Sequence, residues 1–119
     1  MVSIIIASHG EFANGLLNTA GMLMGSLPDV HTVCLYPSEG PDTFREKVLA
    51  TVALCESENV LFMVDLWGGT PCNQIQLLLE NHKKWAMVAG VNVPLLLDAY
   101  TKRDWESAKD VAAAVMGEA

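Results

Sequence analysis

Short apolar runs alternate along the chain with longer segments in which apolar residues recur every three or four positions. The first run, residues 2–7, is rich in β-branched side chains and predicts a strand that is buried on both faces. Residues 12–27 then follow with helical spacing and predict an amphipathic helix. Because parallel strands need helical crossovers, the repeated alternation predicts an α/β fold: an open, doubly wound, mainly parallel sheet with helices on both faces.

The remaining elements follow from the same two periodicities and predict a sheet of about four strands. The further predicted strands cover residues 31–36, 60–64 and 86–91. Two further predicted helices are capped by a side chain: one begins after Asp42 and runs to Cys55, and the other begins after Thr70 with Pro71 in its first turn. A short helix over residues 93–97 and a final helix after Asp104 complete the prediction. The apolar faces are predicted to carry Phe12, Leu16, Ala20, Leu23 and Leu27 in the first helix and Trp105, Ala108, Ala112 and Val115 in the last.

Composition limits what such a chain can do. With 119 residues, 51% hydrophobic and 18% charged, residues 1–119 are predicted to form a single compact domain. The net charge of -7 argues against nucleic acid or anionic lipid as a partner. The three cysteines form no CxxC pair and suggest buried thiols in a reducing compartment, for which the cytoplasm fits best. No segment reads as a secretory signal or a membrane span.

The carboxyl ends of the predicted strands carry polar residues. In open parallel sheets, sites form beyond these ends, near the point where the strand order reverses. If the strands adopt the flavodoxin-like order, His9 and Asp65 follow neighbouring strands and lie close together. A carboxylate on Nδ1–H would fix the tautomer and leave Nε2 as a nucleophile. The plain alternatives are a loop histidine bonded to backbone and an aspartate that shapes a turn.

The segment after Asp65 offers groups that suit a phosphoryl ligand. Gly68 and Gly69 precede a helix start, and Thr70 adds a hydroxyl to the free backbone N–H groups and the positive end of the helix dipole. Ordinary helix capping explains Thr70 equally well at this point. Neither a GxxxxGK[ST] nor a GxGxxG motif is present, so a nucleotide site is not predicted.

Other reactive side chains are not expected to join this site. His31 and His82 should lie away from His9, so no metal site and no cofactor are predicted. Cys72 has no second histidine to activate it and is interpreted as a packed thiol. Trp67 could instead wall the site or contact a partner.

Three segments together resemble a known protein family. Its signature segments are similar to residues 4–10 (IIIASHG), 61–71 (LFMVDLWGGTP) and 88–94 (VAGVNVP) of this chain. The family is the EIIA domain of the bacterial sugar phosphotransferase system, in its mannose-type (mannose, fructose and sorbose) branch. The similarity extends over almost the whole chain. By this resemblance, His9 is phosphorylated at Nε2, Asp65 is its hydrogen-bonding partner, and Thr70 contacts the phosphoryl group.

The resemblance also implies a phosphotransferase component that works through protein partners. HPr would donate the phosphoryl group to His9, and a histidine of EIIB would accept it during phosphoenolpyruvate-dependent sugar uptake. The membrane would be involved only indirectly, through the EIIC and EIID components. A homodimer is implied. Trp67, Glu11 and Tyr36 are the predicted partner surface, and Glu11 stands where some relatives carry an aromatic residue.

Two other functions share parts of this pattern. A dihydroxyacetone-kinase phosphotransfer subunit has the same fold and first-strand histidine, but residues 65–71 resemble the sugar branch. A phosphorylatable regulatory module of a transcription activator is the second alternative. The transported sugar and an exchanged C-terminal strand are not determined by these motifs.

Overall fold

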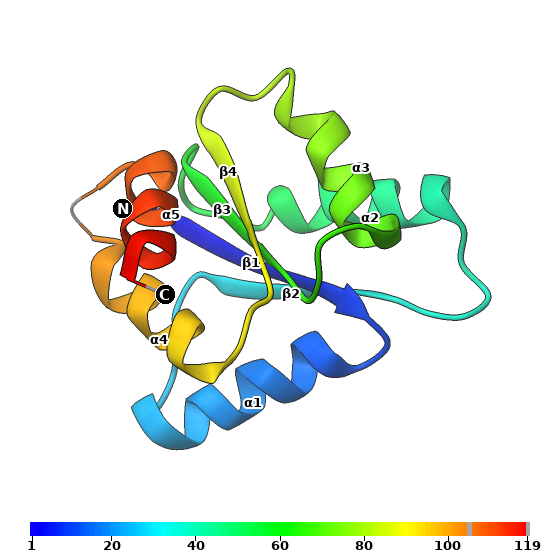
Figure 1. The fold of residues 1–119 in the computed structure, drawn as a ribbon. Coiled ribbons are helices and arrows are strands. Elements are labelled where there is room, and N and C mark those ends of the chain that lie inside the picture. The colour runs from blue at the N-terminus through cyan, green and yellow to red at the C-terminus, as the bar shows by residue number, and fades with distance from the viewer. Residues whose placement is uncertain (105, 119) are drawn as a thin grey trace.

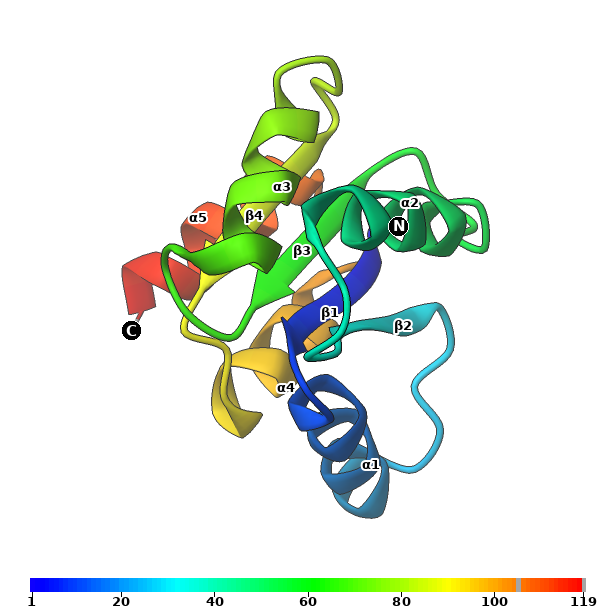
Figure 2. The same ribbon diagram turned by 90° about the vertical axis from the view of Figure 1, so that its right-hand side faces the viewer.

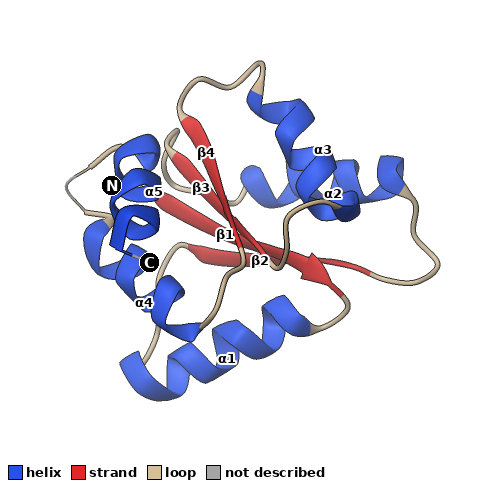
Figure 3. Cartoon of the chain, in the orientation of Figure 1, coloured by secondary structure: helices blue, strands red, loops and turns tan. Residues whose placement is uncertain are grey.

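The computed structural model describes residues 1–104 and 106–118, in which strands and helices alternate before two helices close the chain (Figure 3). The strands are β1 (Ser3–His9), β2 (Val30–Leu35), β3 (Val60–Val64) and β4 (Trp85–Ala89). The helices are α1 (Phe12–Met24), α2 (Pro41–Val52), α3 (Gly69–Leu79), α4 (Val93–Lys102) and α5 (Ala108–Glu118). The predicted α/β class is confirmed.

The strands pair in parallel in the order β2-β1-β3-β4. The first strand therefore lies inside the sheet, where Ile5 pairs with His31 on one side and with Phe62 on the other. The chain moves to one side of β1 to form β2 and to the other side to form β3, so the order reverses between β1 and β3. This is the predicted flavodoxin-like arrangement, and it places the carboxyl ends of β1 and β3 side by side.

Helices cover both faces of the sheet (Figures 1 and 2). Ile4 and Ile6 of β1 point toward α1, α4 and α5, whereas Ile5 and Ala7 point toward α2 and α3. All four side chains are fully buried. The uninterrupted apolar run of β1 is explained by this double coverage, because each face of a central parallel strand meets a helix layer.

The first helix is shorter than predicted. It ends at Met24 with Gly25 as its C-cap, and Leu27 is buried in the connection that follows. The predicted burial of Phe12 and Leu23 is wrong, since these side chains are 46% and 63% exposed. The buried residues of α1 run from Ala13 to Ala20, and Phe12 and Leu23 lie outside that stretch. Periodicity identified the helix face but not where contact with the sheet stops.

The predicted N-cap of α2 is also wrong. Gly40 is the N-cap of α2, and Asp42 lies in the first turn, where it pairs with Arg45 at 3.0 Å. Pro41 begins the helix two residues earlier than an Asp42 cap would, because its fixed φ suits the first helical position and its missing N–H costs nothing there. Cys55 lies beyond the end of α2 and is partly packed against the core.

The last part of the chain differs in its boundaries. β4 begins at Trp85 and ends at Ala89, and α4 runs five residues past its predicted end because Leu96 and Ala99 continue a buried helical stripe. The predicted packing of Trp105 lies outside the described residues. In the described ranges, no helix has both the length and the apolar content needed to cross a bilayer.

Candidate functional site

His9 and Asp65 meet at the carboxyl edge of the sheet. His9 is the last residue of β1, and Asp65 directly follows β3. The Nδ1 atom of His9 lies 2.9 Å from Oδ2 of Asp65, which also accepts the backbone N–H of His9 at 3.0 Å. The second carboxylate oxygen accepts the N–H of Leu66 at 3.0 Å. The carboxylate is therefore held by three donors and fixes the imidazole plane.

The two side chains differ in exposure. The Asp65 side chain is 14% exposed and that of His9 is 46% exposed. Because the carboxylate can only accept, Nδ1 carries the proton in the neutral ring and Nε2 holds a free lone pair. The pair thus presents a nucleophilic nitrogen at the surface, with a charged group behind it that stabilises positive charge on the ring.

The start of α3 packs against this imidazole. A Cβ atom built on Gly69 would lie 3.1 Å from Cε1 and 3.3 Å from Nε2 of His9. Gly68 and Gly69 both have φ in the left-handed region, at 85° and 76°. These glycines allow the chain to turn sharply from β3 into α3 while leaving space beside Nε2.

The N-cap of α3 differs from the prediction. Gly68 is the N-cap of α3, so Thr70 is not a cap; it lies inside the first turn and is part-buried. In the described part of the chain, the Thr70 hydroxyl makes no hydrogen bond. The first-turn N–H groups also receive no side-chain cap. This arrangement leaves both the hydroxyl and the helix N-terminus open to an anionic group.

The predicted partner residues lie on segments that border the site. Glu11 is the N-cap residue of α1 and accepts a hydrogen bond from the hydroxyl of Tyr36, which follows β2. This bond and a second one from Asn14 lower the pKa of Glu11, and the carboxylate raises the pKa of Tyr36 to about 12. Trp67, in the loop between β3 and α3, is 70% exposed. These three residues therefore lie on an accessible surface beside the site. Their contacts do not identify the partner.

Comparison with known proteins identifies the family. A family model described as PTS system fructose IIA component, EIIA-man, matches residues 3–116. The chain belongs to the mannose-type EIIA family. It is also 36% identical over 112 residues to the fructose-specific EIIA component of Bacillus subtilis, covering 93% of this chain and 77% of that protein.

A longer relative and a solved structure agree with this assignment. The chain is 38% identical over 104 residues to the mannose-specific EIIAB component of Escherichia coli K12, covering 87% of this chain. It spans only 32% of that protein's length. The crystal structure of an EIIA component from Streptococcus agalactiae superposes with a TM-score of 0.90 at 27% identity, covering 98% of this chain and 91% of that one. Both comparisons agree with membership of the mannose-type EIIA family.

The remaining predicted residues of this EIIA domain lie where the sequence placed them. Cys72 is fully buried in α3, consistent with a packed thiol. His31 is near the start of β2, and His82 follows α3 and stacks on Trp85, so neither approaches His9.

One contributor to the EIIA site was missed by sequence reasoning. The buried Oγ of Ser8 accepts the N–H of Ala13 at 2.8 Å and so stabilises the first turn of α1 directly behind His9. The signal for it was a serine in a buried strand, five residues before an alanine on the buried face of the next helix. The close approach of Gly69 was also not predicted, because it depends on how the loop folds back.

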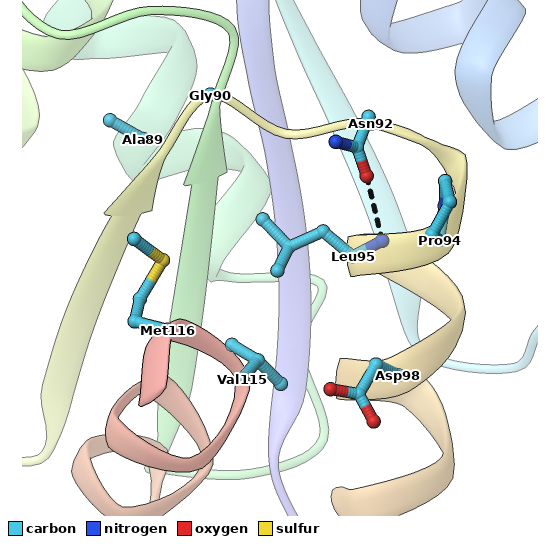
Figure 4. A pocket seen from close by; sticks show the side chains of 8 residues that line it. All are labelled: Ala89, Gly90, Asn92, Pro94, Leu95, Asp98, Val115 and Met116. Atoms are coloured by element: carbon cyan, nitrogen blue, oxygen red, sulfur yellow. Dashed lines mark hydrogen bonds between the residues drawn. The ribbon is translucent and has the colours of Figure 1, made fainter. Parts of the chain in front are cut away.

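A cavity of about 510 Å³ opens elsewhere on the EIIA domain (Figure 4). It lies between the end of β4, the first turns of α4 and the end of α5. Asn92 caps α4 at its rim by accepting the N–H of Leu95, and the Asp98 carboxylate, which pairs with Lys102, is part of the lining. None of the predicted site residues lines this cavity, so it is separate from the His9 site.

Proposed function

We propose that His9 carries a phosphoryl group between two protein partners, accepting it from phospho-HPr and passing it to a histidine of EIIB during sugar uptake. The observation that carries this proposal is the His9–Asp65 pair, with Nδ1 held at 2.9 Å and Nε2 free at an exposed edge. An exposed phosphorylated nitrogen is accessible to two successive macromolecular partners, which a buried one is not.

The transfer steps follow from the arrangement of these groups. The lone pair of His9 Nε2 forms a bond to phosphorus while the nitrogen–phosphorus bond of the donor breaks, and the donor ring keeps the electron pair. The His9 ring gains positive charge and retains its Nδ1 proton, and Asp65 stabilises that charge. The reverse sequence discharges the group to EIIB. No proton has to be taken up or released in either step.

The start of α3 supplies the groups that would hold the phosphoryl oxygens. Gly69 lies against Nε2 of His9 and begins the first turn of α3. The backbone N–H groups of this turn and the Thr70 hydroxyl therefore belong to the segment that approaches Nε2. Backbone N–H groups and the helix dipole stabilise anions at this position. We assign Gly68, Gly69 and Thr70 this role, and Trp67, Glu11 and Tyr36 the role of partner surface. The same proposal places the domain in the cytoplasm as a homodimer.

A regulatory role receives less support. The chain resembles a sigma-54 interaction domain protein from Enterococcus faecalis with a TM-score of 0.81, but at 17% identity this likeness shows the fold alone. The relatives with higher identity are named as sugar-specific components.

The proposal is tested by intact-mass analysis after incubation with phosphoenolpyruvate, enzyme I and HPr. Wild-type protein should gain the mass of one phosphoryl group in an acid-labile form, and addition of EIIB should discharge it. His9→Ala should gain no mass while keeping its far-ultraviolet circular dichroism, because an exposed edge residue contributes little to the core. Absence of the adduct on folded wild-type protein, or its persistence in His9→Ala, would contradict the proposal.

A further inference from the structure

A second cluster of polar side chains lies at the amino edge of the sheet, at the opposite end of β1 from His9. Asp29 directly precedes β2, His31 is the second residue of β2, and Cys55 lies in the connection from α2 to β3. One atom from each side chain, a carboxylate oxygen, a ring nitrogen and the sulfur, lies within 4.8 Å of the others. The phosphoryl-transfer chemistry proposed above uses none of these three residues.

These three atoms are a suitable ligand set for one class of metal ion. An imidazole nitrogen, a thiolate and a carboxylate together suit zinc and its chemical relatives, whereas magnesium and calcium prefer oxygen alone. In a tetrahedral zinc site with bonds of about 2.0–2.3 Å, ligand atoms are roughly 3.3–3.8 Å apart. His31 Nε2 and Asp29 Oδ1 are 2.9 Å apart, and all three ligand atoms lie within 4.8 Å of one another, so side-chain shifts of about 1 Å bring them to tetrahedral separations.

The carboxylate is already fixed in position. Its side chain is fully buried, with Oδ2 accepting from the Ser3 hydroxyl and Oδ1 accepting the N–H of Glu56 at 3.2 Å. Asp29 also has a φ of 60°, the only non-glycine positive φ in the described residues. Hydrogen bonds from outside the ligand set commonly orient metal-binding carboxylates in this way. His31 is two residues further along the chain, in β2, and its Nε2 atom lies 2.9 Å from Oδ1 of Asp29.

The partly exposed histidine provides a route for an ion. The His31 side chain is 23% exposed, which gives solvent access to a cluster whose carboxylate is closed off. We propose that Asp29, His31 and Cys55 form a binding site for a single zinc-class divalent cation, with water as the fourth ligand. On binding, the neutral imidazole turns its lone pair at Nε2 to the metal and carries its proton on Nδ1.

Binding also changes the state of the thiol. Burial and the nearby Asp29 carboxylate raise the pKa of Cys55 to about 11, so the thiol is protonated when no ion is bound. A cation between the two groups opposes that effect, and coordination releases the thiol proton to solvent. This site is independent of the phosphoryl transfer proposed at His9.

Cobalt(II) is the probe that tests the site, because a cobalt–thiolate bond gives a near-ultraviolet charge-transfer absorption. Chelator-treated, reduced wild-type protein should develop this absorption with one equivalent of Co²⁺ and lose it when Zn²⁺ is added. Cys55→Ser and His31→Asn should lose the absorption while staying folded by circular dichroism. Ser3→Ala, which keeps all three ligands but removes the hydrogen bond to Oδ2 of Asp29, should weaken Zn²⁺ binding about tenfold in competition with a chromophoric chelator.

Two variants serve as matched controls. Cys72→Ala removes a different thiol, and His9→Asn removes the histidine at the other edge, so both should keep the absorption. The proposal is overturned if wild-type protein gives no charge-transfer band at one equivalent, if the band survives in Cys55→Ser, or if it disappears in His9→Asn. Because the readout is metal binding and not phosphoryl transfer, its failure is distinct from failure of the proposed function.

Discussion

Single side chains, and not a cavity, define the proposed phosphoryl-transfer site of this EIIA domain. The imidazole of His9 is held by one carboxylate, which is itself held by two backbone N–H groups. Such a shell keeps the ring in one orientation and one tautomer. The proposed transfer therefore depends on a few contacts that substitution can remove one at a time.

Asp65→Asn should keep the fold and slow phosphoryl acceptance. The amide is nearly isosteric, but it carries no charge to stabilise the ring and can present its NH₂ group to Nδ1, which favours the wrong tautomer. We expect the transfer rate to fall by about 10- to 100-fold, measured as a time course of intact mass. An unchanged rate would remove Asp65 from the mechanism.

Gly69→Ala should impair acceptance more than Gly68→Ala. Both glycines have positive φ, so both substitutions strain the backbone, but only a Cβ at position 69 would lie 3.1–3.3 Å from the His9 ring. Displacement of a reacting group by about 1 Å can reduce a rate about 100-fold.

Gly68→Ala is the matched control, since a Cβ there meets nothing within 4 Å. Both variants should lose similar thermal stability, and only Gly69→Ala should lose most of its transfer rate in the mass assay. Equal loss of rate in both would mean that strain, and not crowding of Nε2, is responsible.

Tyr36 should ionise at unusually high pH. Its pKa is raised to about 12, chiefly because its hydroxyl donates to the Glu11 carboxylate. Glu11→Gln removes that charge, so the tyrosinate absorbance should appear at lower pH than in wild-type protein. Tyr36→Phe identifies which part of the titration belongs to Tyr36 and which to Tyr100. A Tyr36 titration that does not move in Glu11→Gln would show that the two residues are not coupled in solution.

Helix starts show where local sequence is informative and where it is not. Asn92 caps α4 by accepting the N–H of Leu95 at 2.8 Å, and Val93 and Pro94 follow in the first turn. Asp42 and Thr70 have equally suitable side chains, but glycine caps α2 and α3. The difference is set by the loop that leads into each helix, which residue type alone does not reveal.

Asn92→Ala should therefore destabilise the domain, whereas Asp42→Ala should not measurably do so. Loss of an N-cap side chain costs about 1 kcal/mol of unfolding free energy. Asp42 makes an ion pair with Arg45 at a highly exposed position, where such pairs contribute little. Urea unfolding of Asn92→Ala and Asp42→Ala measures both changes in unfolding free energy. Equal destabilisation would contradict the observed caps.

The whole domain carries a net charge of -7, which should affect how it meets a basic partner. If the partner HPr presents a basic surface, the association rate should fall as ionic strength rises. Glu11→Gln removes a charge that borders the site, so it should slow association more than Glu80→Gln, which removes one at the end of α3. Stopped-flow measurement across salt concentrations tests both points, and a salt-independent rate would rule out steering.

The strands, their parallel direction and the edge that carries His9 were predictable from the sequence. Burial periodicity is a local property, and the crossover rule limits the topologies that alternating elements can form. The proximity of His9 and Asp65 was predicted on the condition that the strands adopt the flavodoxin-like order, and the observed order β2-β1-β3-β4 meets that condition.

The finer features required the tertiary structure. Asp65 accepts hydrogen bonds from both the backbone N–H and Nδ1 of His9, and this depends on the register that sets Ala7 beside Val64. The contact of Gly69 with the imidazole ring depends on the turn between β3 and α3. The Asp29, His31 and Cys55 cluster joins residues up to 26 positions apart at the other edge of the sheet. Periodicity and strand ends follow from neighbours in sequence, whereas these contacts follow from register and loop paths, which only the packing of the whole chain determines.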